Sequence, residues 1–441
     1  MAGEWRDTTI GEHVELVTGE AFQSARFGTT PDSGTLLARG DNVKEGEFEW
    51  GEKARYWPEL TPDLERYLLR EDDVLLGMDG SKVGKNWVRV RSKDLPCLLV
   101  QRVARLRAKP TMDQRFLRYL IGNPQFREYI ERVRTGTSIP HISGGQIKSY
   151  EISLPSLSEQ KAIAGVLGAL DDKIELNRRT NGTLEAMARA LFQSWFVDFD
   201  PVRAKLDGRH PTGMDQATAD LFPDSFDYSS NGVIPKGWTV DAIKTRATNI
   251  QYGFTQSSTE DPIGPHFLRI TDIRGGKIEW SSVPFCKTTE DEREKYRVMD
   301  GDIYIARTGA STGDSIYVVE PPSAVFASYL IRLQFASRGI GRIVGEFIRT
   351  PDYANYIAGN IGGTAQPNAN AQTLTAASMV FPTEEIADAF YRIVRPFDLQ
   401  RAANDRESRI LADLRDTLLP KLLSGELSIT KRTLGERKCA Q

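Results

Sequence analysis

Three short segments carry residue types that could perform chemistry, and each departs from the pattern that its chemistry needs. Residues 80–86, GSKVGKN, are similar to a phosphate-binding loop, but Asp79 stands where the first glycine belongs and Asn86 replaces the hydroxyl residue that binds magnesium. Asp171-Asp172-Lys173 has the acid-x-Lys spacing of many nucleases, yet the matching residues in the second half of the chain, Asp398-Leu399-Gln400, lack the lysine. We therefore expect a solvated helix face at Asp171.

Other catalytic patterns are also incomplete. An adenine methyltransferase needs an Asn- or Asp-Pro-Pro-aromatic loop, whereas the one Pro-Pro pair here lies between Glu320 and Ser323. The three cysteines, Cys97, Cys286 and Cys439, are scattered, and the chain has four histidines. This pattern indicates neither a disulfide framework nor a zinc site. The sequence predicts a protein without a catalytic centre, a metal site or a cofactor of its own.

Length and composition set the class of protein. A chain of 441 residues with 40% apolar residues is expected to form two or more domains. It has no run of eighteen apolar residues, and residues 1–5, MAGEW, lack the basic-then-apolar pattern of a signal peptide. We expect a soluble, cytoplasmic protein without a membrane partner.

Charge is distributed unevenly although the formal net charge is only −3. Residues 80–134 contain fourteen Lys and Arg against four acids, whereas residues 1–79 contain eighteen acids against eight bases. The segment 80–134 therefore predicts a basic face that could contact nucleic acid, with solvated surface charges as the alternative.

A long internal repeat organises the chain. A shift of 227 residues pairs Arg105-Leu106 with Arg332-Leu333, Pro124 with Pro351 and Pro140 with Pro367, and a shift of 229 pairs Asp73, Gly80 and Gly84 with Asp302, Gly309 and Gly313. The 227 shift also relates Asp171, Asn177, Leu184 and Leu191 to Asp398, Asn404, Leu411 and Leu418. The chain is predicted to be two copies of one unit.

Each copy combines β-rich runs punctuated by Gly and Pro with a long segment of helical periodicity, such as Ile163, Leu167, Leu170 and Ile174. Unbroken, such a helix would be roughly 55–60 Å long, although Gly182 could interrupt it. The predicted fold is α+β and internally duplicated, with two globular domains separated by two long antiparallel helices that pack as in a coiled coil. The predicted parts are residues 1–155 for the first globular domain, 156–200 for the central helix, 201–234 for an acidic linker containing Pro and Gly, 235–382 for the second globular domain, 383–430 for the C-terminal helix, and 431–441 for a tail.

Several stretches resemble one family, the specificity subunits of type I restriction-modification systems. They are LFQSWFVDFDPVRAK at 191–205, LFPDSF at 221–226, IPKGW at 234–238, LSEQ at 157–160 and LLPKLLSGEL at 418–427. The resemblance implies two target recognition domains that each read half of a split, asymmetric duplex DNA target. It also implies that the helices dock two methyltransferase subunits, which restriction and translocase subunits join, and that S-adenosylmethionine, ATP and magnesium are bound by these partners.

Loops that match between the two copies supply the candidate DNA-contacting residues, because shared Gly and Pro keep the loop shape while the polar residues change. The candidates are Met78, Ser81, Lys82, Lys85, Arg102, Ser138, His141 and Ser143 in the first domain, and Arg269, Arg307, Thr308, Ser311, Thr312, Tyr329, Thr364, Gln366, Asn368 and Asn370 in the second. Alternatively, Gly80 and Gly309 simply close hairpins and His141 is an ordinary surface histidine.

The apolar helix stripes supply the candidate subunit-interface residues, which are Ile163, Leu167, Leu170, Ile174, Leu184, Leu191, Trp195, Phe397, Leu411 and Leu418. Two other functions stay open at this point. One is a free-standing adenine DNA methyltransferase, against which the missing cofactor loop counts. The other is a structural coiled-coil adaptor that makes no DNA contact.

Overall fold

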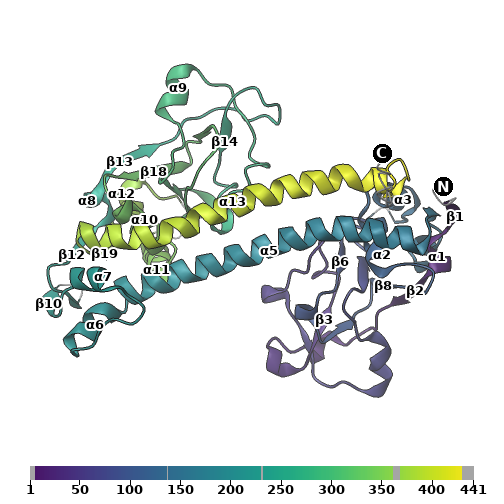
Figure 1. Ribbon diagram of the computed structural model, residues 1–441. Coiled ribbons are helices and arrows are strands. Elements are labelled where there is room, and N and C mark those ends of the chain that lie inside the picture. The colour runs from purple at the N-terminus through teal and green to yellow at the C-terminus, as the bar shows by residue number, and fades with distance from the viewer. Residues whose placement is uncertain (1–4, 137, 230–231, 361–367, 430–441) are drawn as a thin grey trace, which may run out of the picture. The chain divides into compact units, whose positions relative to one another are not determined.

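The protein is described by a computed structural model that covers residues 5–136, 138–229, 232–360 and 368–429. The chain forms two compact units, the first made of residues 1–175 and 408–441 and the second of residues 176–407. Each unit contains one globular domain and part of two 40-residue helices, α5 (Leu157–Phe196) and α13 (Glu384–Leu423) (Figure 1). Among the described residues, no helix is both long and apolar enough to cross a membrane.

The globular domain of the first unit is built on an antiparallel four-stranded sheet in the order β2-β8-β5-β6. Strands β3 and β7 pair in parallel beside it, and β1 pairs with β9. Helices α2 and α3 follow β8, and α4 precedes β9. The bounds are β1 Arg6–Thr9, α1 Ile10–His13, β2 Val14–Thr18, β3 Thr35–Ala38, β4 Tyr56–Trp57, β5 Val74–Gly77, β6 Trp87–Arg89, β7 Cys97–Leu99, β8 Val103–Ala108, α2 Gln114–Gly122, α3 Pro124–Val133, α4 Gly144–Lys148 and β9 Glu151–Leu154.

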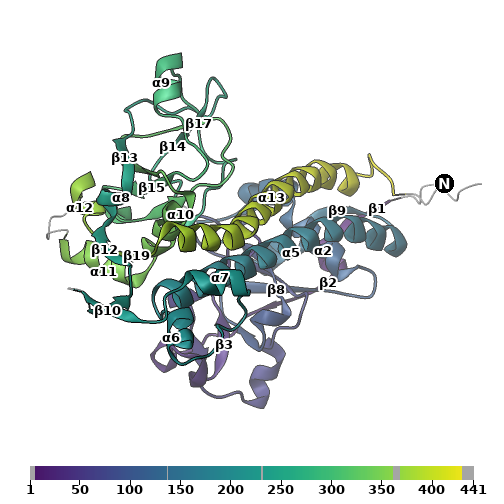
Figure 2. The same cartoon turned by 60° about the vertical axis from the view of Figure 1, so that its left-hand side comes forward.

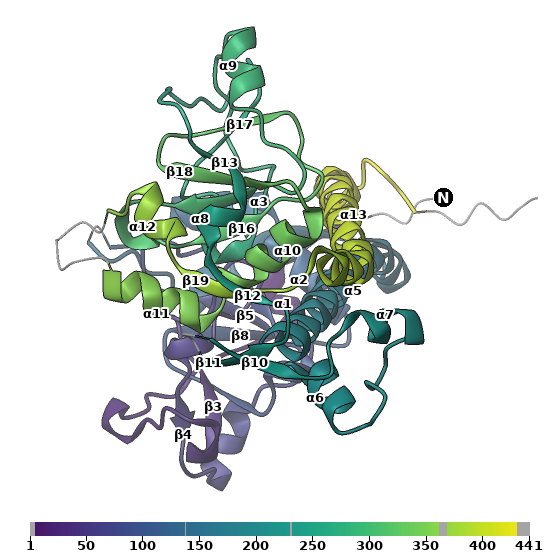
Figure 3. The ribbon, with the colours of Figure 1, turned by 90° about the vertical axis from the view of Figure 1, so that its left-hand side faces the viewer.

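The second unit repeats this plan, although among the described residues it has no strand that matches β4, and it has an additional helix, α9. Its antiparallel sheet has the order β13-β18-β15-β16, β14 and β17 pair in parallel, and β12 pairs with β19. Figure 3 shows α10, α11 and α12 grouped around these strands. The bounds are β12 Thr239–Ala242, α8 Ile243–Arg246, β13 Ala247–Tyr252, β14 His266–Leu268, α9 Glu290–Lys295, β15 Ile303–Ala306, β16 Ser315–Tyr317, β17 Ala324–Phe326, β18 Leu330–Phe335, α10 Arg338–Phe347, α11 Pro351–Asn360, α12 Ala371–Thr375 and β19 Ser378–Phe381. The predicted α+β duplication is confirmed.

Side-chain alternation along the central strand explains why each domain has two cores. In β5, Val74 and Leu76 enter one buried cluster and Leu75 enters another. In β15, Ile303 and Ile305 enter one cluster and Tyr304 enters another. Because successive residues of a strand face opposite sides of the sheet, a continuous apolar run is buried on both faces.

The two long helices run antiparallel within each unit. In the second unit, Asn177 donates to Glu407 at 2.8 Å and Asn181 donates to Asp405 at 2.7 Å, so rising numbers on α5 meet falling numbers on α13. In the first unit, Arg415 of α13 donates to Asp171 of α5 at 2.9 Å. Helix α5 continues through Gly182 without a break, which answers the question that the sequence left open.

Ion pairs fasten each globular domain to the helices. In the first unit, Arg118 of α2 and Tyr119 hydrogen-bond to Asp171. In the second unit, Arg342 of α10 donates to Asp398 at 2.7 and 3.1 Å. The prediction that Asp171 lies on a solvated helix face is therefore wrong, because this carboxylate is an anchor between α5 and the domain.

The segment predicted as a surface linker, 201–234, is folded. It forms α6 (Asp200–Leu206), α7 (Gln216–Leu221) and a hairpin of β10 (Phe226–Ser229) and β11 (Gly232–Pro235), and Figure 2 shows α6 and α7 beside the end of α5. Val202 and Phe222 are buried in the core of the second unit, where the Phe222 ring meets that of Trp195 edge to face at 5.0 Å. Apolar side chains within the acidic stretch cause this packing.

Candidate nucleic-acid interface

Three chain segments meet just beyond β5 in the first unit. The backbone nitrogen of Met78 donates to the carbonyl of Arg102 at 2.9 Å, and that of Ile142 donates to the carbonyl of Met78 at 2.9 Å. A β-bridge also pairs Asp79 with His141. This hydrogen-bonded frame brings the side chains of residues 79, 102 and 141 together.

The second unit builds the same frame at the matching positions. The nitrogen of Arg307 donates to the carbonyl of Tyr329 at 3.0 Å, that of Ala369 donates to the carbonyl of Arg307 at 2.8 Å, and a bridge pairs Thr308 with Asn368. Gly80 and Gly309 both have positive φ, 96° and 74°, which glycine adopts without the steric cost of a Cβ. The shared glycine therefore preserves the loop conformation, as the sequence predicted.

The side chains on the first frame are charged and hydrogen-bonded to one another. Asp79 accepts from the Arg102 guanidinium through one carboxylate oxygen and contacts Nδ1 of His141 through the other. Although partial burial opposes the shift, these hydrogen bonds and charges hold the pKa of Asp79 below its usual value. Asp79 is 14% exposed, whereas Arg102 is 67% exposed. The sequence interpretation missed Asp79, whose signal was its place beside the repeat-matched glycine.

The side chains on the second frame are uncharged. Thr308, Tyr329 and Asn368 stand where the first unit has Asp79, Arg102 and His141, and Tyr329 is 53% exposed. The neighbouring cation, Arg307, lies with its guanidinium 5.2 Å from the centre of the Tyr252 ring. The two frames thus offer different hydrogen-bonding groups from one backbone geometry.

The basic face predicted for residues 80–134 is largely neutralised. Nine of its ten arginines form ion pairs, and six of these nine pair with acids that precede Gly80, as in Arg107 with Asp73 and Arg127 with Glu45. Within the described part of the chain, Lys82 and Lys85 form no ion pair, and both are exposed. The same holds for Lys93, Lys109 and Arg132, so the loop after Gly80 carries two of the five exposed cations of this segment for which no ion pair is present.

Burial removes two of the predicted DNA contacts. Met78 is 5% exposed and belongs to the core of the first unit, and Ser311 is 3% exposed. The prediction is wrong for these two side chains because the protein itself encloses them. Ser81 and Ser138 are exposed, whereas Thr364 and Gln366 lie outside the described residues.

Four other candidates make local structural bonds. Ser143 caps α4 by accepting from the Gln146 nitrogen at 3.2 Å, and Asn370 caps α12 by accepting from the Thr373 nitrogen at 2.8 Å. Arg269 donates to both carboxylate oxygens of Asp272, at 3.0 and 2.9 Å, and Thr312 donates to the Gly309 carbonyl at 2.7 Å. These bonds occupy groups that base readout would need.

The candidate interface residues on the helices divide by burial. Ile163, Leu167 and Trp195 are almost fully buried in the cores of their own units, so the prediction that they contact a partner is wrong. Leu170, Ile174, Leu184, Leu191, Phe397, Leu411 and Leu418 are half-buried. The sequence interpretation missed the most exposed apolar residues of the helices, which are Leu176, Met187, Ile410 and Leu414.

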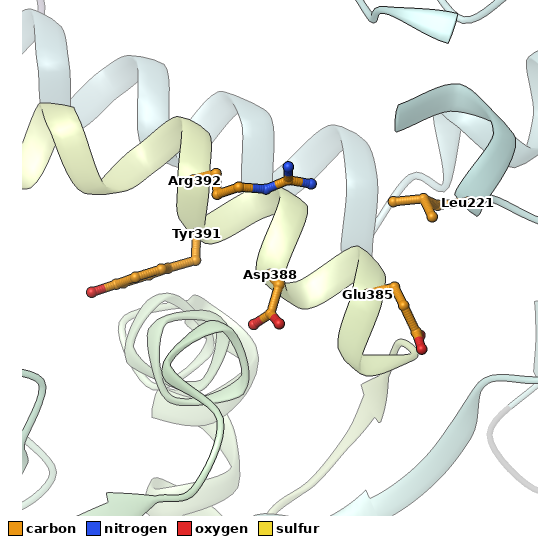
Figure 4. Close-up of a pocket in the computed structure, with 5 residues that line it drawn as sticks. All are labelled: Leu221, Glu385, Asp388, Tyr391 and Arg392. Carbon is orange, nitrogen blue, oxygen red and sulfur yellow. The ribbon is translucent and has the colours of Figure 1, made fainter. Parts of the chain in front are cut away.

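One cavity lies beside α13. A cavity of about 520 Å³ is lined by Glu385, Asp388, Tyr391 and Arg392 of α13 together with Leu221 of α7 (Figure 4). Its side chains come mainly from the solvent-facing side of one helix. In the described ranges, no group of three His, Cys, Asp or Glu side chains is placed to hold a metal ion.

Comparison with known proteins gives consistent similarities. Residues 3–186 match the model of the type I restriction modification DNA specificity domain. The chain is 26% identical over 359 residues to the type I restriction enzyme HindI specificity subunit of Haemophilus influenzae, covering 71% of this chain and 77% of that protein. It is 20% identical over 440 residues to the EcoKI specificity subunit of Escherichia coli, covering 96% and 89%.

A solved structure shares the fold. The crystal structure of the type I restriction-modification system S subunit from M. genitalium covers 95% of this chain, and the match covers 96% of that chain. The TM-score is 0.59 at 17% identity. The similarity therefore extends over both units and not only over the segment that matches the family model.

Proposed function

We propose that this chain, which is similar to the DNA specificity subunits of type I restriction-modification enzymes, is such a subunit and that its two globular domains each read one half of a split, asymmetric duplex DNA target. The observation that carries this proposal is the pair of matching frames beyond β5 and β15, which present different side chains from one backbone geometry. Base readout needs polar groups held in a fixed geometry, and two frames with different groups suit two different half-sites.

Contacts to the DNA backbone are proposed for Lys82 and Lys85. Both lysines are exposed and lie on the loop that Gly80 opens. A lysine that neutralises a phosphate contributes affinity and salt dependence without base preference. Arg102, His141, Thr308, Tyr329 and Asn368 are the proposed base-reading groups.

The helices are proposed to carry the partner subunits. Leu176 and Met187 in the second unit, and Ile410 and Leu414 in the first, expose apolar surface that a methyltransferase subunit would cover. Restriction and translocase subunits would then join this complex in the cytoplasm.

The chemistry is proposed to belong to those partners, with S-adenosylmethionine, ATP and magnesium bound there and not by this chain. The loop 80–86 supports this division because several of its backbone nitrogens are already engaged. Gly80 donates to Pro140 at 2.9 Å, Val83 donates to Gly80 at 3.1 Å, and Lys85 donates to Lys82 at 3.0 Å. A phosphate-binding loop needs such groups free.

The test is methyl transfer by the reconstituted complex. The chain purified with its methyltransferase should methylate adenines in one split sequence, and the chain alone, given labelled S-adenosylmethionine and DNA, should transfer nothing. Methyl transfer by the chain alone would favour a free-standing methyltransferase. Binding to DNA that neither prefers a sequence nor weakens with salt would contradict specific readout.

A further inference from the structure

The charged group on the first frame is not needed to hold that frame. In the second unit, Thr308 and Asn368 form the same β-bridge as Asp79 and His141, with no acid and no arginine among the three matched positions. The backbone bonds of the two frames agree in partner and in length to within 0.1 Å. Because the loop forms without them, the charged side chains of Asp79, Arg102 and His141 are expected to have a role other than loop stability.

Asp79 restrains both of its neighbours. One carboxylate oxygen accepts from Nη1 of Arg102, and the other contacts Nδ1 of His141. Arg102 itself adopts a left-handed backbone conformation, with φ of 66°, which a residue with a Cβ rarely takes. Both its backbone and one end of its side chain are thus fixed, while two-thirds of the side chain is exposed.

A fixed, exposed guanidinium has a specific use in DNA recognition. Arginine has five N–H donors in a planar fork, and Asp79 engages only one edge of that fork. The other donors match the O6 and N7 acceptors that guanine presents in the major groove, and an acidic neighbour that prevents the side chain from swinging to a phosphate increases base discrimination.

We propose that Asp79 is a positioning residue that orients Arg102 to read a guanine in the half-site of the first unit, whereas the second unit reads its half-site through neutral groups at Thr308, Tyr329 and Asn368. This inference rests on the proposed function. Arg102 then contacts a guanine in the half-site of the first unit. In the second unit, no charged side chain contacts a base from the three matching positions.

The experiment uses the full chain in complex with its methyltransferase and a set of target duplexes. Once the preferred target is known, each G·C pair of each half-site is replaced by A·T, and binding is measured for the wild type, Asp79→Asn, Arg102→Lys and Arg102→Ala. The matched control is the double variant Thr308→Ala/Asn368→Ala. For the wild type we expect one G·C pair in the first half-site whose replacement weakens binding about tenfold or more.

Arg102→Ala and Arg102→Lys should both abolish discrimination at that pair, because lysine keeps the charge but not the fork. Asp79→Asn should reduce the discrimination several-fold while binding to non-specific DNA changes little, and the second half-site should be read as in the wild type. The control should alter reading of the second half-site only. Arg102→Lys keeps its ion-pairing partner, so it tests the contact even where Asp79→Asn perturbs the loop.

Two outcomes overturn the inference. The first is a half-site for the first unit in which Arg102→Lys and Asp79→Asn leave every base preference unchanged. The second is an equal loss on all duplexes, which would make Arg102 a phosphate contact. A wild-type complex that binds every duplex equally would instead refute the proposed function itself.

Discussion

Asp73 in the first unit and Asp302 in the second hold the same place before the central strand, and their side chains are 2% and 3% exposed. Arg107 donates to both oxygens of Asp73 at 2.7 Å. Asp302 instead accepts from Gln334 at 2.7 Å and from the Tyr304 hydroxyl at 2.9 Å, and the nearest arginine nitrogen, on Arg332, is 3.8 Å away. Burial accordingly raises the pKa of Asp302 above its usual value, although these partners oppose the shift.

The ion pairs that anchor each globular domain to the helices also differ between the units, and here the second unit has the more deeply buried charges. In the first unit, one acid, Asp171, is shared by two arginines, Arg118 and Arg415, and is partly exposed. In the second unit, one arginine, Arg342, is shared by two acids, Asp398 and Glu346, and all three are almost fully buried. The duplicated fold thus fixes where a charged side chain sits, while the sequence of each copy decides how its charge is balanced.

Replacing the arginine of each anchor gives the sharpest contrast. Arg342→Met leaves the buried Glu346 carboxylate without a counter-charge and leaves Asp398 with Arg401 alone, 3.9 Å away, so we expect the second unit to lose about 4 kcal/mol of unfolding free energy. Arg118→Met leaves Asp171 with Arg415, so the first unit should lose only about 1–2 kcal/mol. Hydrogen exchange of peptides from each unit measures both losses, and equal losses would refute the contrast.

The aspartates before the central strands give a smaller difference. Asp73→Asn removes the charge that holds Arg107, and we expect a loss of about 2 kcal/mol in the first unit. Asp302→Asn removes no charge from an arginine within hydrogen-bonding distance, but its amide nitrogen cannot accept from Gln334 or from the Met299 nitrogen, so the second unit should lose about 1 kcal/mol. Denaturant unfolding followed by hydrogen exchange measures the loss of unfolding free energy for each variant. A larger loss for Asp302→Asn than for Asp73→Asn would contradict this prediction.

Asp302 also predicts a pH dependence. Because its folded-state pKa is raised, the folded second unit holds the Asp302 proton more tightly than the unfolded chain does, and ionisation of this group lowers stability as pH rises through the folded pKa. When the pH is lowered from 7 to about 4.5, the unfolding free energy of the wild type should therefore rise relative to that of Asp302→Asn. Hydrogen exchange measures this difference in unfolding free energy, and a difference that does not change with pH would contradict the raised pKa of Asp302.

The helix surfaces give the smallest effect on folding. Ile410→Asp changes a side chain that is 61% exposed, so folding should change by less than about 0.5 kcal/mol while assembly with the methyltransferase weakens. Leu167→Asp, the buried comparison, should instead unfold the first unit. Sizing chromatography of the mixed subunits separates these outcomes, and normal assembly of Ile410→Asp would remove this residue from the proposed docking surface.

The duplication and the alternation of globular domains with long helices could be predicted, because they follow from the repeated Gly and Pro positions and from the local spacing of apolar residues. Charge pairing could not, because the partners of the arginines in residues 80–134 come from a distant part of the chain, as Glu15 does for Arg105. The sequence therefore predicted a basic face where the structure has mostly neutral pairs.

Some structural roles had readable signals that the sequence interpretation passed over. Ser143 and Gln146 have the spacing of a capping box, which assigns the Ser143 hydroxyl to the start of α4. Val202 and Phe222 are apolar residues within the acidic stretch and marked it as folded. The burial of Met78 and Ser311 had no local signal, because it depends on how segments distant in sequence meet.

The central claim is that each globular domain reads its own half of the target. Its most direct test replaces residues 238–382 with the corresponding domain of another specificity subunit and maps methylated adenines in cells that carry the complete system. We predict a new sequence in one half of the target and an unchanged sequence in the other. A change in both halves, or in neither, would contradict independent reading by the two domains.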